Sequence, residues 1–138
     1  NFAKPTLSDS VSFGGSIPNT LTTIPAGTKF FAEVGEVNGL AGVVIVFTFD
    51  ATGKPTPKGL TLSKPKSGVS KYNVTASKWT FAALLSNAGL TSKTVSKSAQ
   101  KLNFNVFFNN GSYAATKDIS YSATLGKSGS ASLLKVKP

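Results

Sequence analysis

The feature that most constrains this chain is the regular spacing of its turn-forming residues. Clusters of Gly, Pro, Asn and Asp recur about every eight to fifteen residues, and the segments between them are rich in Val, Phe, Tyr, Thr and Ile. This spacing is typical of all-β proteins, because each short strand must turn back to pair with a neighbour. We therefore predict an all-β fold.

Length and composition favour one domain. A chain of 138 residues with 40% hydrophobic content can bury one core but is short for two. It contains no Cys, so neither disulfides nor thiolate metal sites can hold the fold together. The longest apolar run, residues 39–49, is about half the length of a membrane-spanning helix, so we expect no transmembrane segment.

The first expected strand covers residues 7–13. The odd positions read Leu, Asp, Val and Phe while the even positions are all Ser, so one face is apolar with Asp9 as its polar exception. The Gly pair at 14–15 predicts a bend or bulge at the end of this strand. We divide the chain into an N-terminal extended strand, residues 1–13, and a sandwich domain, residues 14–138.

The remaining strands follow from alternation or from apolar runs. Residues 42–49 are apolar on both faces, so we predict a central strand that is covered on both sides. Residues 50–59 contain two prolines and two glycines and are expected to form a surface loop. Other strands are expected at residues 28–37, 59–65, 69–76, 101–108, 112–116, 117–125 and 131–138. The pattern predicts a single antiparallel β-sandwich, Ig-like or jelly-roll-like, with about eight or nine strands.

One segment has helical rather than strand periodicity. Residues 78–87 are predicted to form a short helix, with Ser77 as N-cap and Gly89 just past the C-terminal end. Residues 101–116 form the clearest hairpin. Asn110-Gly111 is expected to occupy the central positions of its type I′ turn, because both positions require positive φ.

The charge is strongly positive and consists of a single cation type. The chain contains fifteen Lys, no Arg and five acidic residues, which gives a net charge of +10. Arg supplies the planar fork that reads base edges, so we expect no sequence-specific nucleic-acid binding. The lysines are scattered, and they form either a solubilising coat or a surface that attracts an acidic polymer such as a cell-surface polysaccharide.

Several catalytic chemistries are excluded. The chain has no His and no Cys, which removes the nucleophilic triads and the usual zinc sites. Among the five acids, Glu33 and Glu36 are closest in sequence but point to opposite faces of a strand, which disfavours a glycosidase pair. We expect no enzyme, no cofactor and no metal, and a small hydrolase that uses two distant acids is the weakest alternative.

Surface chemistry leaves two further predictions. Asn73 and Asn110 begin N-x-S/T acceptors for N-glycosylation, and Asn110 is better placed because it lies on a turn. A platform of aromatic residues could stack on sugar rings. The same residues could instead be a helix anchor (Trp79) and ordinary half-buried strand residues. The residues of this platform are Tyr72, Trp79, Tyr113 and Tyr121.

The N-terminal segment suggests how copies of the chain could associate. An extended apolar segment can complete the sheet of the next subunit by β-strand addition. In layout the chain resembles secreted filament subunits of the donor-strand type, such as pilins and archaeal surface threads, although it lacks the cysteine pair of chaperone-assembled pilins. The resemblance implies that Leu7, Val11 and Phe13 insert into a neighbour's groove.

Taken with a first residue that is not Met, this resemblance predicts an exported protein, extracellular or on the cell surface. The leading functional prediction is a non-enzymatic structural subunit of an extracellular filament or surface assembly, with itself as partner. The alternative is a secreted β-sandwich module that binds carbohydrate or an acidic polymer through Lys and exposed aromatics.

Overall fold

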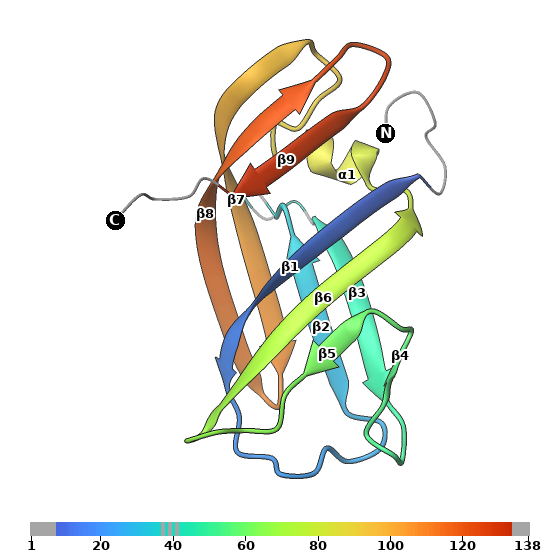
Figure 1. Cartoon of the computed structure of the whole chain (residues 1–138), viewed down its shortest axis with the longest axis vertical. Helices are drawn as coiled ribbons and strands as arrows, with labels where there is room; N and C mark the ends of the chain where they lie inside the picture. Colours follow the sequence, from blue (N-terminus) through green and yellow to red (C-terminus); the bar gives the residue numbers. More distant parts are fainter. Residues whose placement is uncertain (1–7, 37, 39, 41, 134–138) are drawn as a thin grey trace.

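The computed structural model describes residues 8–36, 38, 40 and 42–133, and this part of the chain forms nine strands and one short helix (Figure 1). The strands are β1 (Asp9–Pro18), β2 (Lys29–Val34), β3 (Val43–Phe49), β4 (Pro55–Thr56), β5 (Leu60–Leu62), β6 (Val69–Trp79), β7 (Val95–Phe108), β8 (Gly111–Ala123) and β9 (Gly129–Leu133). The helix is α1 (Ala82–Ser86).

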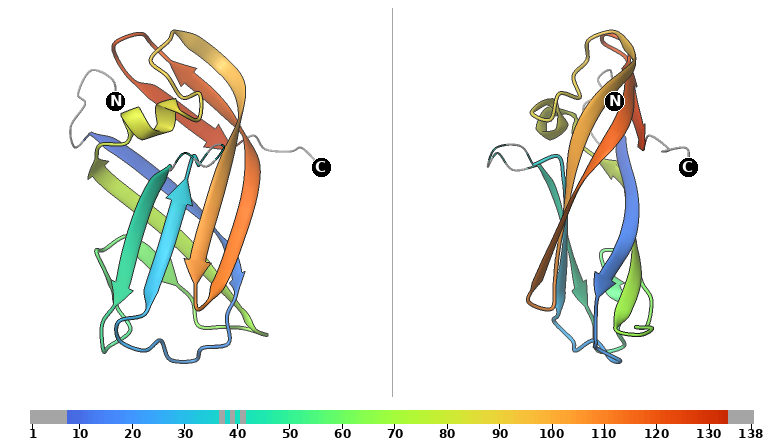
Figure 2. Two further views of the ribbon diagram at one scale, coloured as in Figure 1. Left: turned by 180° about the vertical axis from the view of Figure 1, so that it is seen from behind. Right: turned by 90° about the vertical axis from the view of Figure 1, so that its left-hand side faces the viewer.

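The strands form two antiparallel sheets that face each other. The smaller sheet has the order β1-β6-β5, and the larger has the order β4-β3-β2-β7-β8-β9. The edge-on view in Figure 2 shows the two layers, with the upper part of the β7–β8 hairpin extending beyond the smaller sheet. The predicted all-β, two-sheet sandwich with one short helix is confirmed.

Aromatic side chains join the two sheets. Phe30 on β2 is fully buried, and its ring lies 5.5 Å from Tyr72 on β6 and 5.6 Å from Phe108 on β7. Phe13 on β1 contacts Phe104 on β7 at 5.2 Å. These tilted ring contacts add about 0.5–1.5 kcal/mol each to the area that they bury. The core therefore has its firmest contacts in the half of the sandwich where both sheets are present.

The first strand passes through the glycines that were predicted to end it. β1 pairs with β6 as far as Pro18, including Gly14 and Gly15. A Cβ on Gly14 would lie 2.6 Å from the backbone oxygen of Tyr72, and one on Gly15 would lie 3.0 Å from the Tyr72 hydroxyl. The glycines thus permit close approach of β1 to β6. β1 also crosses the predicted boundary between residues 13 and 14.

The prediction that residues 42–49 are covered on both faces was wrong. Burial alternates along β3, and the outward side chains of Val44 and Val46 are 44% and 37% exposed. Phe31 of β2 pairs with Val46 on one side and with Phe107 of β7 on the other, so Phe107 lies on the same outer face as Val46. The Phe107 side chain is 41% exposed. The apolar run therefore builds a sheet with one buried face and one exposed apolar face.

The long hairpin is confirmed, but its turn is displaced by one residue. Asn109 and Asn110 occupy the left-handed region, with φ of 48° and 61°, and Gly111 pairs with Phe108. Asn tolerates positive φ, so Gly is not needed in the turn. Gly111 instead leaves room for the ring of Tyr113, which fills the place of its missing side chain. The two strands predicted at 112–116 and 117–125 are one strand, β8.

The helix is shorter than predicted because β6 continues through Trp79, which pairs with Asp9. Ser77 is not the N-cap, and the helix is capped by a residue that is distant in sequence. The Asp9 carboxylate accepts hydrogen bonds from the backbone N–H groups of Phe81 at 2.6 Å and Ala82 at 2.9 Å. Burial raises the pKa of Asp9, but hydrogen bonds to its carboxylate, these two among them, hold the pKa below its ordinary value of 3.8.

Asp9 should consequently stabilise the fold in a pH-dependent way. We expect Asp9→Ala to lower the free energy of unfolding at neutral pH by about 0.5–2 kcal/mol, as for the loss of other helix caps. A carboxyl whose folded pKa is depressed stabilises above its ordinary pKa, here 3.8, and loses that contribution as the pH falls through the folded value. The gap between wild type and Asp9→Ala should therefore narrow in acid, as measured by urea unfolding.

Asp118→Ala is the matched control, because it also removes one negative charge. Asp118 forms a 2.8 Å ion pair with Lys101 in which both side chains are well exposed, and such pairs contribute little. A loss of stability as large for Asp118→Ala as for Asp9→Ala would contradict the role of Asp9.

Candidate functional site

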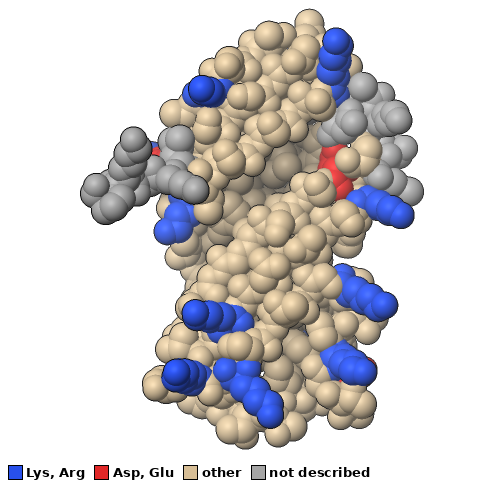
Figure 3. Space-filling view, in the orientation of Figure 1, with Lys and Arg blue, Asp and Glu red and all other residues tan. Residues whose placement is uncertain are grey.

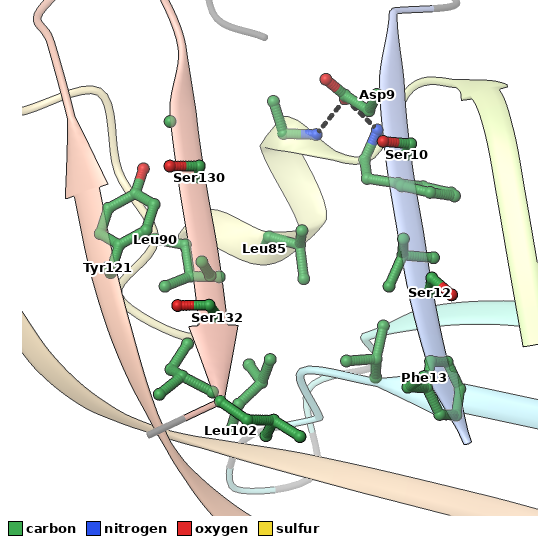
Figure 4. A pocket seen from close by; sticks show the side chains of 18 of the residues that line it. Asp9, Ser10, Ser12, Phe13, Leu85, Leu90, Leu102, Tyr121, Ser130 and Ser132 are labelled. Atoms are coloured by element: carbon green, nitrogen blue, oxygen red, sulfur yellow. Dashed lines mark hydrogen bonds between the residues drawn. The ribbon is translucent and has the colours of Figure 1, made fainter. Parts of the chain in front are cut away.

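The principal cleft of the described structure lies between β1 and β9. In this part of the chain each of these strands is at the edge of its own sheet, so the sandwich is open between them. The cleft has a volume of about 500 Å³, and Figure 4 shows β1 on one side, β9 on the other and α1 behind. It is thus a gap between two strand edges, each of which has backbone groups without a strand partner on the cleft side.

The cleft exists because the strands differ in length. β7 has 14 residues and β8 has 13, whereas β2 has six. β2 pairs with only the last five residues of β7, from Phe104 to Phe108. The other half of the hairpin extends past β2 and is paired on the far side of β8 by β9. The smaller sheet does not follow this half of the hairpin (Figure 1), and β9 and β1 line the two sides of the cleft.

The floor of the cleft is apolar and comes from four elements and the loop after α1. Leu85 projects from α1, and Leu90 follows that helix. Leu85 is half-buried, whereas Leu90 is buried. The remaining apolar floor residues are Val34 of β2, Leu102 and Phe104 of β7, and Ile119 of β8. Val34, Leu90, Leu102 and Ile119 are already buried, so an apolar ligand face would mainly cover the half-buried Leu85 and Phe104.

The rims carry small hydroxyl side chains. Ser10 and Ser12 lie on β1, and Ser130 and Ser132 on β9 (Figure 4). Of the described acids, Asp9 is the one that lines the cleft, and it is engaged with the start of α1. Figure 3 shows the hollow with an acid at its rim and with lysines farther from it. The cleft therefore combines an apolar floor with strand edges that carry Ser side chains and one carboxylate, that of Asp9.

The residues predicted for strand insertion lie partly in this cleft. Val11 and Phe13 are on β1, where they pair with Ala76 and Val74 of β6 in the same chain. Both side chains are half-buried and line the cleft. Leu7 lies outside the described residues. In the described structure Val11 and Phe13 therefore belong to the groove of their own chain.

The four predicted aromatic residues do not form one platform. Tyr72 packs in the core against Phe13 and Phe30. Tyr121 is buried, and its hydroxyl donates to the carbonyl of Thr91 at 2.7 Å. Burial raises the pKa of both tyrosines.

The other two members of the predicted platform also have separate surroundings. Tyr113 covers Gly111, and its hydroxyl donates to the carbonyl of Pro18 at 3.4 Å. Trp79 is 36% exposed at the end of β6 and lines a separate, smaller groove. Trp79 is therefore the member of the set that is best placed to meet a ligand.

The acids outside the cleft have separate local partners. Asp50 closes its own turn, since its carboxylate accepts hydrogen bonds from Lys54 and Thr52, which lower its pKa. Glu33 accepts hydrogen bonds from Asn105 at 3.1 Å and from the backbone of Gly42 at 3.3 Å. Within the described ranges, no group of three or more acidic, His or Cys residues could hold a metal ion.

In the same part of the chain, no helix is long and apolar enough to span a membrane. Comparison with protein-family models, with curated proteins and with solved structures finds no match to this chain. Function is therefore inferred from the geometry of the cleft and of the smaller groove.

The sequence reasoning missed most of the cleft. It named Val11 and Phe13 as residues that insert into a neighbour's groove, not as part of this one, and it named neither Leu85 nor the edge formed by β9. One signal was present: Asp9 interrupts the apolar face of the first strand. A buried acid on such a face requires hydrogen-bond donors, and here these belong to the start of α1.

The two glycosylation acceptors lie in different environments. Asn110 is exposed at the tip of the β7–β8 turn. Asn73 lies on β6, between β1 and β5, and its side chain donates to Thr75 at 3.3 Å. A glycan at the turn would disturb no strand neighbour, whereas one at Asn73 would displace this hydrogen bond.

We expect that glycosylation of the native protein, where it occurs, is found at Asn110 before Asn73. Intact-mass measurement of native material, followed by peptide mapping, tests this expectation. Asn110→Gly should remove the added mass without loss of stability, because Gly tolerates the positive φ of this position, and Asn73→Gln is the paired control. A native protein that carries a glycan at Asn73 and none at Asn110 would contradict the prediction.

Proposed function

We propose that this protein is a non-enzymatic structural subunit of an extracellular filament or surface assembly that polymerises by β-strand addition. In this proposal the segment that precedes β1 in one copy enters the cleft between β1 and β9 of the next. The observation that carries the proposal is the pair of strand edges facing each other across an apolar floor.

The β9 edge of the cleft has the length of one short strand. β9 contributes a five-residue edge, from Gly129 to Leu133. Five residues of β-strand span about 17 Å, at roughly 3.4 Å per residue. An inserted strand of this length would pair with an edge on each side, which supplies backbone hydrogen bonds, and its inward side chains would cover the floor. One inserted strand would thus pair with both edges and cover the apolar floor.

The segment before β1 has a suitable pattern for this role. Residues 1–7 read NFAKPTL, so Ala3, Pro5 and Leu7 share one face in an extended conformation. Asn1 is the polar exception on that face, and the opposite face contains Phe2, Lys4 and Thr6. Of the three residues predicted for insertion, Val11 and Phe13 belong to the receiving groove in the described structure. The proposal therefore assigns insertion to Leu7, in the donor segment before β1. Pro5 lacks an N–H, so the strand would form one backbone hydrogen bond fewer.

The proposal can be tested with two complementary defects. Deletion of residues 1–7 removes the donor and leaves the groove. Leu85→Arg places a charge in the groove floor and leaves the donor. We expect wild type to form fibres in negative-stain electron microscopy and each variant alone to remain monomeric in sedimentation velocity. An equimolar mixture of the two should form a discrete heterodimer, because one donor can enter one intact groove and the chain then terminates.

Leu84→Arg is the matched control for the groove variant. Leu84 is the neighbouring helix residue, is 40% exposed and is not part of the cleft lining. Leu84→Arg should assemble like wild type. A wild-type protein that stays monomeric at high concentration, equal loss of assembly in Leu84→Arg and Leu85→Arg, or a mixture that gives only monomers would each overturn the proposal.

A further inference from the structure

A second groove lies at a different opening of the sandwich and shares no lining residue with the β1–β9 cleft. It has a volume of about 260 Å³ and lies between β3, the loop before β5, and the end of β6. Pro57 and Lys58 line it from the loop, and Trp79 lines it from β6. This volume is below the roughly 300–1,000 Å³ of drug-sized sites, so the groove suits a single ring.

A β-bulge brings Trp79 to this groove. Ser10 pairs with Ser77 and Asp9 pairs with Trp79, so Lys78 is an additional residue in β6. Lys78 has φ of 62°, which is uncommon for a residue other than Gly. Without the bulge, strand alternation would place residue 78 on the same side as the buried Val74 and Ala76. Because the bulge shifts the alternation by one residue, Trp79 rather than Lys78 lies on that side of the strand.

Trp79 is held in place but is not covered. Its ring lies 5.5 Å from the ring of Phe81, which is buried, so the indole rests on the core. The side chain nevertheless remains 36% exposed. A supported, partly exposed indole offers a flat apolar surface and loses little conformational freedom on binding.

The charge around the groove is positive. Lys58 is exposed and is the charged residue in the groove lining. We propose that this groove binds one pyranose unit of an acidic polysaccharide. In this arrangement the apolar face of the sugar ring stacks on Trp79, and the sugar carboxylate pairs with Lys58. This site concerns a ligand, and it does not depend on assembly through the cleft.

The chain contains a single Trp, so intrinsic fluorescence reports directly on this site. The probe is an oligogalacturonate, and its fully methyl-esterified counterpart is the neutral comparison. We expect saturable quenching or enhancement of Trp emission by the acidic oligomer and weaker binding of the ester. Lys58→Gln should weaken binding of the acid about two- to fivefold, as for one partly exposed charge pair, and leave binding of the ester unchanged.

Lys127→Gln is the matched control, because it removes the same charge from the exposed turn between β8 and β9, away from the groove. Trp79→Ala is followed by calorimetry and should lose saturable binding. Trp79→Phe keeps a ring against Phe81 and should retain part of the affinity. Equal effects of Lys58→Gln and Lys127→Gln, or no saturable response, would overturn the proposal, since diffuse attraction to lysines would then explain binding.

The measurements should be repeated on Leu85→Arg. That variant is designed not to assemble but retains the groove at Trp79. Binding of the acidic oligomer by Leu85→Arg would support the sugar site whether or not wild type polymerises. Absence of binding in wild type and in Leu85→Arg would contradict the sugar site and leave the assembly proposal unaffected. Failure of this inference is thereby separated from failure of the assembly proposal.

Discussion

The constraint on which the rest of the structure depends is the unequal length of the strands. The β7–β8 hairpin is about twice as long as β2, the strand that it pairs with, so one half of it belongs to the sandwich and the other half extends beyond. In the first half, Phe30, Tyr72 and Phe108 fill the space between the sheets. In the second half β9 and β1 are not paired with each other in the described structure, and the cleft lies between them.

Two long-range contacts keep this cleft open and shaped. Asp9 holds the start of α1 against β1, so the helix closes the back of the cleft and presents Leu85 to it. Phe13 contacts Phe104 and ties β1 to β7 at the end of the gap. A strand that entered would therefore meet a surface that is already formed, which lowers the entropic cost of binding. No lysine is among the described residues that line the cleft, so an entering strand would not face a cation there directly.

Much of the fold could be predicted from local pattern. The alternation in β7 can be read from the sequence, and it puts Leu102, Phe104, Val106 and Phe108 on one face, of which all but the half-buried Phe104 are buried. Other features could not be predicted, because they depend on contacts between distant residues. Gly14 was taken for a bend, but it serves the approach of Tyr72, which lies far along the chain. Trp79 has helical spacing with later residues, yet pairing with Asp9 keeps it in β6.

The sequence alone determined the chemistry that this protein can use and the class of its fold. Without His or Cys, and with few acids, the functional surface consists of strand edges, apolar side chains, hydroxyls and lysines. Periodicity and turn residues were sufficient for the two-sheet sandwich, because these signals act within a few residues. Only the tertiary structure decided which strands are edges, that Asp9 caps α1 and where Trp79 lies. The physical reason is that edges and clefts arise from the relative lengths and registers of strands that are distant in sequence.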